Sequence, residues 1–235
     1  MFLIRERLYN LVTGKTKGPL AVFLRGCLFA FSLVYGAAVV ILAAFYRIRQ
    51  VRLSVKVISV GNITLGGTGK TTLVEYLSTK LSLAGNKIAV LSRGYKRYSG
   101  RLGAQGMGDE PAMIQKKLPS VKVVVDKNRI KAAQVAIQDY ASNILILDDG
   151  LQQWKIFKDL EIVTIDAQNP FGNYRLLPAG FLREPLFALK RADIFVLTQS
   201  SPGQDLSGLT AKLKRINSRA LVVESRHEPK GVSWL

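Results

Sequence analysis

A short glycine-rich stretch has the residue types and spacing of a phosphate-binding loop. It follows the strand-like run VKVISV and precedes LVEYLSTKL, which has helical spacing. The loop consists of Gly66, Gly67, Thr68, Gly69, Lys70 and Thr71. Glycines let backbone N–H groups point at phosphate oxygens, and the helix N-terminus adds a favourable dipole. We therefore expect this P-loop to bind ATP, with Lys70 on the β- and γ-phosphates and the Thr71 hydroxyl on Mg²⁺. One departure is Thr64, which stands where the strict motif has glycine.

A pair of acidic residues follows a second apolar run. The run ILIL at residues 144–147 is followed directly by Asp148, Asp149 and Gly150. Ligands of open α/β sheets bind at the carboxyl ends of the strands, and carboxylates are ligands that Mg²⁺ prefers. We therefore expect Asp148 and Asp149 to complete a Mg²⁺ site. The alternative is a simple turn, which Asp-Gly often marks.

Phosphoryl transfer also requires groups that bind and activate the acceptor. Asp109 and Glu110 lie in GDEP at an expected helix start, where an N-cap is the alternative interpretation. Arg93 lies just past an expected strand in SRGY, and Arg183 and Glu184 lie in LREP. Arginine presents a planar fork that matches phosphate, whereas surface salt bridges are the alternative for both motifs.

The elements that must position these residues follow from the pattern after residue 55. Short β-branched runs are expected as strands at residues 56–60, 87–91, 121–125, 144–147, 160–165, 194–198 and 221–223. Helices are expected at residues 70–84, 110–118 and 128–140, and a flexible glycine-rich loop at residues 99–108. Apolar strands that alternate with helices indicate an α/β fold with a P-loop NTPase-like, mainly parallel sheet and flanking helices.

The N-terminal part of the chain has the composition of a membrane anchor. Residues 26–46 contain no charged residue and would span about 30 Å as a helix. Residues 1–56 carry nine basic residues against Glu6 alone, within a formal net charge of +18. This pattern favours anionic lipid over nucleic acid, for which no binding motif is present. We expect residues 1–50 to anchor the chain and residues 51–235 to form the P-loop domain. A buried core helix is the alternative, and crossing the bilayer or dipping into one leaflet are both open.

Six sequence blocks occur in the order found in the tetraacyldisaccharide 4′-kinase family of Gram-negative bacteria. They are SVGNITLGGTGKT, LSRGYKR, GDEP, LDDGLQQ, RLLPAGFLREPL and LKRADIFVLT. The chain resembles this family over roughly residues 50–230, and its apolar segment resembles the family's membrane anchor. The resemblance implies transfer of the ATP γ-phosphate, with Mg²⁺, to the 4′-hydroxyl of a lipid-linked glucosamine disaccharide 1-phosphate. It also implies a location at the cytoplasmic face of the inner membrane, for lipid A biosynthesis.

The same resemblance assigns roles to individual residues. The expected catalytic residues are Lys70, Asp109 and Asp149. The expected Mg²⁺ ligands are Thr71, Asp148 and Asp149. Arg129, Arg183 and Glu184 match family positions near the substrate or nucleotide, and Arg93 is expected near the substrate from its own SRGY motif.

The chain departs from the family pattern at several positions. Leu151 replaces an aromatic residue, Gln153 a histidine and Phe181 a proline. We further expect the chain to lack the family's C-terminal portion, whose Asp-His motif assists the catalytic acid, and we assign His227 no catalytic role. The chain would then be a fragment or a shortened, impaired relative that binds nucleotide without transfer. A third interpretation is a membrane-associated P-loop ATPase switch. The oligomeric state stays open.

Overall fold

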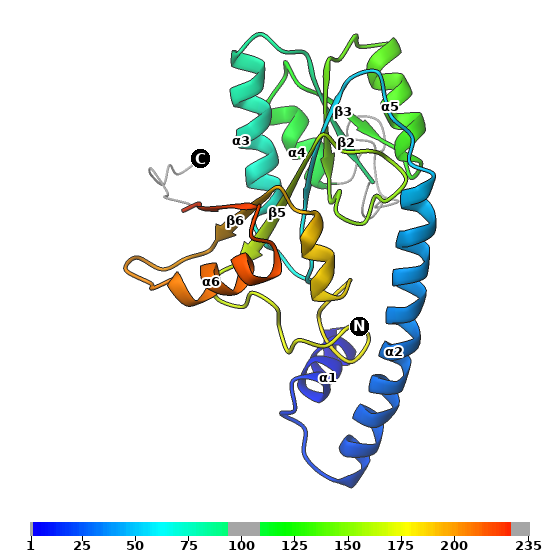
Figure 1. Cartoon of the computed structure of the whole chain (residues 1–235), viewed down its shortest axis with the longest axis vertical. Coiled ribbons are helices and arrows are strands. Elements are labelled where there is room, and N and C mark those ends of the chain that lie inside the picture. The colour runs from blue at the N-terminus through cyan, green and yellow to red at the C-terminus, as the bar shows by residue number, and fades with distance from the viewer. Residues whose placement is uncertain (1, 94–108, 227–235) are drawn as a thin grey trace.

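The computed structural model describes residues 2–93 and 109–226, and they form a parallel sheet covered by helices (Figure 1). The seven strands are ordered β3-β2-β4-β1-β5-β6-β7, and every neighbouring pair is parallel. Their bounds are Lys56–Gly61 (β1), Ile88–Ser92 (β2), Lys122–Val125 (β3), Ile144–Asp148 (β4), Leu160–Asp166 (β5), Ile194–Thr198 (β6) and Leu221–Glu224 (β7). All seven expected strands are confirmed, with ends shifted by at most one residue.

Side chains of alternate strand residues pack against different helices, because successive residues of a strand face opposite sides of the sheet. On one face, Ile146 packs in a cluster with Val74 of α3 (Lys70–Leu83) and Ile114 of α4 (Asp109–Lys117). On the other face, Leu145 and Leu147 pack against the alanines of α5 (Arg129–Gln138). Burial on both faces explains why these strands are continuous apolar runs.

The expected helices at residues 70–84, 110–118 and 128–140 are confirmed as α3, α4 and α5. Three further helical elements were not expected from the sequence: α1 (Phe2–Val12), the 3₁₀ helix η1 (Leu186–Arg191) and α6 (Ser207–Ile216). Leu213 of α6 and Leu189 of η1 join a third core cluster with Phe195 and Leu197 of β6. The expected loop at residues 99–108 lies outside the described residues.

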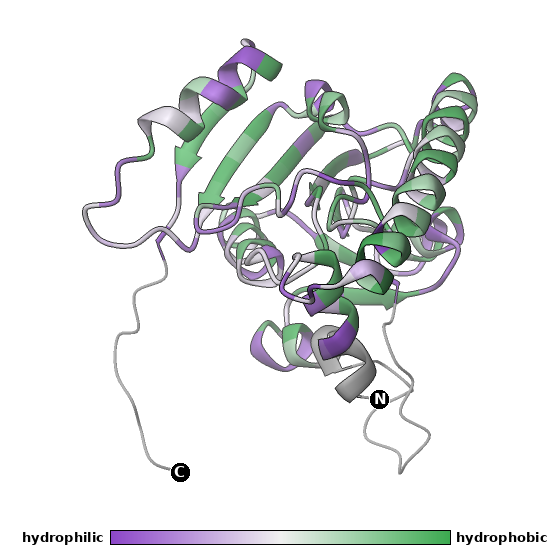
Figure 2. Ribbon diagram, turned by 90° about the horizontal axis from the view of Figure 1, so that it is seen from below, coloured by the Kyte–Doolittle hydropathy of each residue, from purple (hydrophilic) through white to green (hydrophobic). Residues whose placement is uncertain are grey.

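The apolar segment at residues 26–46 lies within one long helix, α2 (Pro19–Ile48), which is green along most of its length in Figure 2. Length and composition make it a candidate membrane span, with a mean hydropathy of 2.4 and 17% burial in its most apolar window. Its buried residues Ser32, Gly36, Val39 and Ala43 recur at helical spacing and form one narrow face. Large apolar side chains such as Phe23, Phe31 and Ile41 are exposed on the other faces.

The narrow face of α2 packs along the α/β domain. The Tyr35 hydroxyl donates to the Arg183 carbonyl at 2.9 Å. A Cβ added at Gly36 would lie 2.6 Å from Leu176 Cδ1, so a glycine permits the close approach. Near the C-terminal end of α2, the Lys155 ammonium lies 4.5 Å from the centre of the Tyr46 ring. The helix is therefore docked on the domain over much of its length.

Candidate active site

The P-loop connects the carboxyl end of β1 to the start of α3, in the centre of the sheet. Gly66 and Gly69 have φ values of 129° and 70°, in the region that favours glycine. Strand β1 lies between β4 and β5, and its Val60 is in register with Asp148. The chain runs from β1 to one side of the sheet and later crosses to the other, so the loop lies at a topological switch point, where ligands bind.

Backbone and side-chain contacts tie the P-loop to the neighbouring strand ends. The Thr68 hydroxyl is 2.7 Å from the Thr164 hydroxyl of β5, and both side chains are buried. The Thr198 hydroxyl of β6 donates to the Thr68 carbonyl at 3.1 Å, and Gln199 Nε2 donates to the Gly67 carbonyl at 2.6 Å. These contacts hold the loop open in a fixed shape before any phosphate binds.

Thr64 does not disturb this shape. It is not among the positive-φ residues, so its backbone does not require glycine. It forms an isolated antiparallel bridge with Leu182, and the Leu65 N–H donates to the Phe181 carbonyl at 2.7 Å. The first position of the P-loop therefore anchors the loop to the LREP segment.

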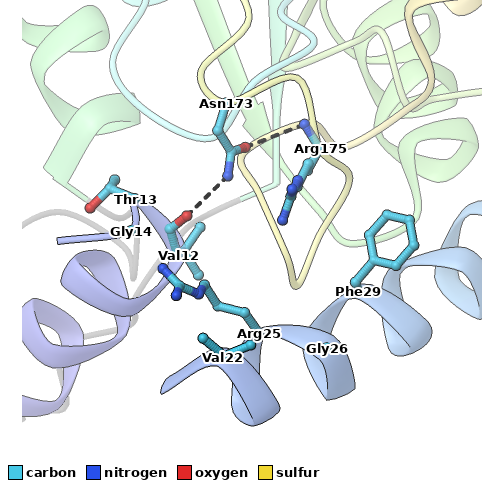
Figure 3. Close-up of a pocket in the computed structure, with 9 residues that line it drawn as sticks. All are labelled: Val12, Thr13, Gly14, Val22, Arg25, Gly26, Phe29, Asn173 and Arg175. Atoms are coloured by element: carbon cyan, nitrogen blue, oxygen red, sulfur yellow. Dashed lines mark hydrogen bonds between the residues drawn. The ribbon is translucent and has the colours of Figure 1, made fainter. Parts of the chain in front are cut away.

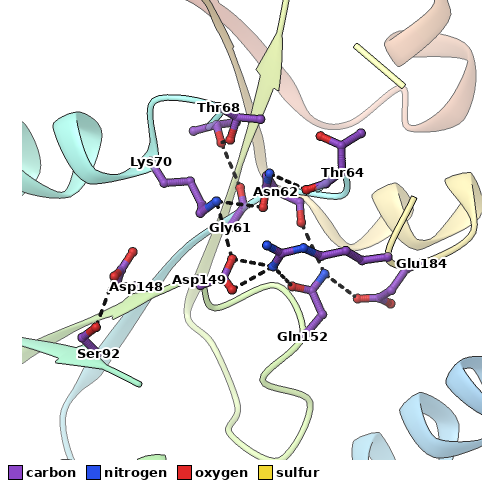
Figure 4. Close-up of polar contacts among 12 residues, drawn as sticks. Gly61, Asn62, Thr64, Thr68, Lys70, Ser92, Asp148, Asp149, Gln152 and Glu184 are labelled. Carbon is purple, nitrogen blue, oxygen red and sulfur yellow. Dashed lines mark hydrogen bonds and ion pairs between the residues drawn. The ribbon is translucent and has the colours of Figure 1, made fainter. Parts of the chain in front are cut away.

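Lys70 lies at the centre of a polar cluster (Figure 4). Its ammonium donates to Asn62 Oδ1 at 3.0 Å and lies 3.6 Å from Asp149 Oδ1. Burial lowers the pKa of Lys70 below its ordinary value, and the Asp149 carboxylate counteracts this shift. Asn62 was not expected from the sequence, and its only signal was a polar residue directly after an apolar strand.

Asp149 is shared between Lys70 and Arg183. Arg183 NH1 donates to both carboxylate oxygens of Asp149, at 2.8 and 2.7 Å. Asp149 has a φ of 55°, and a Cβ at Gly150 would collide with the Ser59 hydroxyl. Asp149-Gly150 is therefore a tight turn as well as part of the site, so the two interpretations of this pair are compatible.

Asp148 faces a different set of groups from its neighbour. It is buried, and its Oδ2 accepts from the Ser92 hydroxyl at 3.4 Å. Arg129 NH2 donates to the Asp148 carbonyl at 3.4 Å, and its NH1 donates to the Asp126 carbonyl at 2.8 Å. Burial lowers the pKa of Arg129 to about 10, while the Asp148 charge opposes that shift.

The described residues fit a Mg²⁺ ion that is held jointly with a nucleotide. Among them, no group of three or more His, Cys, Asp or Glu side chains could hold a metal by itself. Mg²⁺ beside nucleotides, however, uses one or two protein ligands together with phosphate oxygens and water. Thr71 in the first turn of α3 and the carboxylates of Asp148 and Asp149 offer the required hard oxygens.

Glu184 lies behind Arg183 and is 1% exposed. Its carboxylate accepts two bonds from Arg191 NH2, at 2.9 and 2.8 Å, and one each from Gln152 and Trp154. Gln152 Oε1 also accepts from Arg183 NH1 at 3.3 Å. The sequence had no signal for Gln152 or Arg191 as members of the site, because their partners are distant along the chain.

The remaining expected residues are placed less completely. Arg93 is exposed at the end of β2, next to Ser92. Asp109 is the first residue of α4, but its side chain lies outside the described part of the chain, as does the whole of His227. The substrate roles of Arg93, Arg129, Arg183 and Glu184, and the catalytic role of Asp109, stay predictions.

Known proteins match both the sequence and the fold. A family model described as tetraacyldisaccharide-1-P 4′-kinase matches residues 24–233. A tetraacyldisaccharide 4′-kinase from Halothermothrix orenii is 38% identical over 94% of this chain and 62% of its own length. One from Syntrophotalea carbinolica is 39% identical over 82% of this chain and 58% of its own length. The chain thus spans about three fifths of these curated relatives.

A solved structure agrees with these sequence matches. The crystal structure of "apo" form LpxK from Aquifex aeolicus in complex with ATP superposes with a TM-score of 0.71 and 34% identity. The match covers 86% of this chain and 64% of that one. The family match includes α2 from residue 24 onward, as well as the P-loop and the LREP segment. The chain belongs to the tetraacyldisaccharide-1-P 4′-kinase family.

Proposed function

We propose that the chain carries the ATP-dependent 4′-kinase activity of its family. It would phosphorylate the 4′-hydroxyl of a lipid-linked glucosamine disaccharide 1-phosphate in lipid A biosynthesis. The observation that supports this most is the cluster in which Lys70, Asp149 and Arg183 meet at the mouth of the P-loop. Two cations around one carboxylate at a phosphate-binding loop suit a reaction that depends on positioning and charge stabilisation.

The proposed chemistry divides among the residues of this cluster. The backbone of residues 66–71 and the Lys70 ammonium bind the triphosphate, and Thr71, Asp148 and Asp149 would hold Mg²⁺. The bound ion would neutralise charge on the phosphates. Arg183 leaves part of its contact with Asp149 and turns toward the transferring phosphoryl group, and Arg93 binds substrate from the end of β2.

Asp109 takes the proton of the 4′-hydroxyl while the oxygen of that hydroxyl forms its bond to the γ-phosphorus. The bond from that phosphorus to the β–γ bridging oxygen breaks, and ADP leaves. Arg129 and Glu184 are buried, which suits a positioning role rather than direct contact with a sugar. Arg129 would position Asp148, and Glu184 would position Arg183.

We also propose that residues 1–50 hold the domain at the cytoplasmic face of the inner membrane, where ATP and the lipid acceptor meet. Contacts between α2 and the domain extend from Phe29, whose ring contacts Arg175, to Tyr46, whose ring contacts Lys155. This part of the helix is about 25 Å long. If α2 crossed the bilayer, Arg175 and the polar Arg183 region would enter hydrocarbon at high cost. This favours a helix that lies in one leaflet with its large apolar side chains outward.

A transfer assay with the full chain in membranes tests the activity. Labelled ATP and disaccharide 1-phosphate should yield a labelled bisphosphorylated lipid, and Lys70→Ala should abolish it because the triphosphate loses its cation. Lys80→Ala, on the exposed side of the same helix, is the matched control and should retain activity. Absence of the bisphosphorylated product with the unaltered chain would overturn the proposal.

A further inference from the structure

A second cleft, of about 500 Å³, lies away from the P-loop, between the α1–α2 connection and the segment at residues 171–175 (Figure 3). Arg25 of α2 and Arg175 supply its charged groups, and Val12, Val22 and Phe29 supply apolar walls. In Figure 3 the Arg175 side chain extends from its segment toward α2, and the Arg25 side chain extends from α2 toward Val12 at the end of α1. The cleft therefore combines two guanidinium groups with an apolar surface.

Neither guanidinium group of this cleft has a carboxylate partner within the part of the chain that the structure describes. Arg25 is half-buried and Arg175 is exposed, and the ion pairs of the described residues involve other cations. The Arg175 guanidinium group lies over a ring face, 5.7 Å from the centre of Phe29. Two like charges directed into one cleft repel each other, so a bound anion would stabilise the arrangement.

Local contacts hold the cleft in shape. Asn173 Nδ2 donates to the Val12 carbonyl at 3.2 Å, and Asn173 Oδ1 accepts from the Arg175 N–H at 3.3 Å. The side chain of Asn173 thus fixes the end of α1 and the backbone of Arg175 together. At Gly14, whose φ is 77°, an added Cβ would lie 3.3 Å from Arg25 NH1. A side chain there would crowd the guanidinium group, so glycine keeps the cleft accessible.

The surroundings indicate what kind of anion enters. Val22 and Phe29, which form apolar walls of the cleft, are themselves 60% and 46% exposed. An anion at this position is therefore next to a surface that suits acyl chains. Arginine forks match the geometry of phosphate oxygens, which they bind bidentately.

We propose that this cleft binds the phosphate of a membrane lipid, with Arg25 and Arg175 on the phosphate oxygens and an acyl chain along Val22 and Phe29. Two sources carry this chemistry, a phospholipid headgroup and the 1-phosphate of the disaccharide lipid. The proposal does not depend on phosphoryl transfer, because it concerns binding at a cleft separate from the P-loop.

Vesicle co-sedimentation of the purified full chain tests the proposal. Four vesicle types are compared: phosphatidylcholine alone, and phosphatidylcholine with phosphatidylglycerol, with disaccharide 1-phosphate, or with the dephosphorylated disaccharide lipid. The double variant R25Q/R175Q removes both forks. The control R7Q/K17Q removes the same charge from exposed residues near the same end of α2. Both variants lose the same long-range attraction to the vesicles, but R25Q/R175Q also loses charge-assisted hydrogen bonds to the phosphate. It should therefore bind phosphate-containing vesicles about tenfold more weakly than the control.

The outcomes separate the sources and the alternatives. A loss on phosphatidylglycerol vesicles identifies a phospholipid headgroup, and a loss confined to the disaccharide 1-phosphate identifies the sugar phosphate. Either result supports the proposal. Equal losses in R25Q/R175Q and R7Q/K17Q, or equal binding of the unaltered chain to all four vesicle types, would overturn it in favour of diffuse attraction or purely apolar binding. Unchanged thermal unfolding of both variants, expected because neither arginine has an ionic partner, excludes misfolding as the cause.

Discussion

Arg183 and Arg175 lie on one segment of the chain but in opposite electrostatic situations. Arg183 contacts both oxygens of Asp149, whereas Arg175 has no carboxylate partner among the described residues. Their backbones are close, since the Leu182 N–H donates to the Arg175 carbonyl at 3.0 Å. The nucleotide site thus contains a carboxylate between its cations, whereas the cleft lined by Arg25 and Arg175 contains none among the described residues. A phosphate group at the nucleotide site must compete with Asp149 for its cations. An anion in the cleft would instead supply the negative charge that the described residues there lack.

Neutralising the Asp149 carboxylate of the nucleotide site tests this comparison with the largest expected effect. Asp149→Asn should lower the rate of phosphoryl transfer roughly 10²–10³-fold, because Mg²⁺ loses a ligand and Lys70 and Arg183 lose their shared orientation. ATP affinity, measured by equilibrium dialysis, should change much less. Asp205→Asn removes the same charge at an exposed turn and should leave the rate unchanged. A rate within threefold of the unaltered chain would mean that Asp149 only forms the turn.

The buried ion pair behind the site tests whether charge balance also stabilises the fold. Glu184→Gln removes the partner of Arg191, whose side chain is 15% exposed, and should lower the free energy of unfolding by about 3 kcal/mol. Glu224→Gln breaks an exposed pair with Arg226 and should cost much less, because solvent and salt screen exposed pairs. Urea unfolding of both variants measures the two costs. Equal costs would show that burial of this pair adds nothing to stability.

These pairs also show how far the sequence alone predicts the molecule. The inner strands β1, β2, β4, β5 and β6 are predictable because they are largely buried on both faces and have continuous apolar runs, whereas the mostly exposed edge strand β7 is marked only by its short β-branched run. The P-loop is predictable because its glycines, Lys70 and Thr71 act within one short local stretch. Asn62, Gln152 and Arg191 are not predictable as site members. Their roles depend on contacts such as Gln152 to Asn62, which join residues ninety positions apart.

The long apolar helix α2 illustrates the same limit. Its length and composition predict an apolar helix at residues 26–46, and α2 confirms it. The composition says nothing about the docked face, because Ser32 and Gly36 look unremarkable in an apolar run. Contacts such as the Tyr35 hydroxyl on the Arg183 carbonyl and the approach of Gly36 to Leu176 show that α2 packs against the segment that carries Arg175 and Arg183.

Two glycines of α2 test whether this docking supports the arginine segment. Gly36→Ala places a Cβ against Leu176 and should destabilise the chain by about 1 kcal/mol, since the leucine must shift. Gly26→Ala meets nothing within 4 Å and should stabilise the helix by up to about 1 kcal/mol. Thermal unfolding in detergent compares the two variants. Equal shifts of the same sign would argue against a docked α2 in the folded protein.

The smallest expected effect is a pH dependence caused by Lys70. Burial lowers its pKa below the ordinary 10.5, so between the lowered value and 10.5 the unfolded chain binds more protons than the folded one. The free energy of unfolding therefore rises with pH across this window.

The measurement compares the unaltered chain with Lys70→Met. Lys158, whose pKa is also lowered by burial, adds a similar rise, but this rise is common to both proteins. Urea unfolding gives the free energy of unfolding of each protein, and the value for the unaltered chain minus that for Lys70→Met isolates the contribution of Lys70. This difference should increase with pH in this window. Bound ATP should flatten it, because phosphate favours the charged ammonium. Parallel curves for the two proteins would show that Asp149 already compensates the burial of Lys70 in full, and the nucleotide site would then be balanced more completely than the lowered pKa indicates.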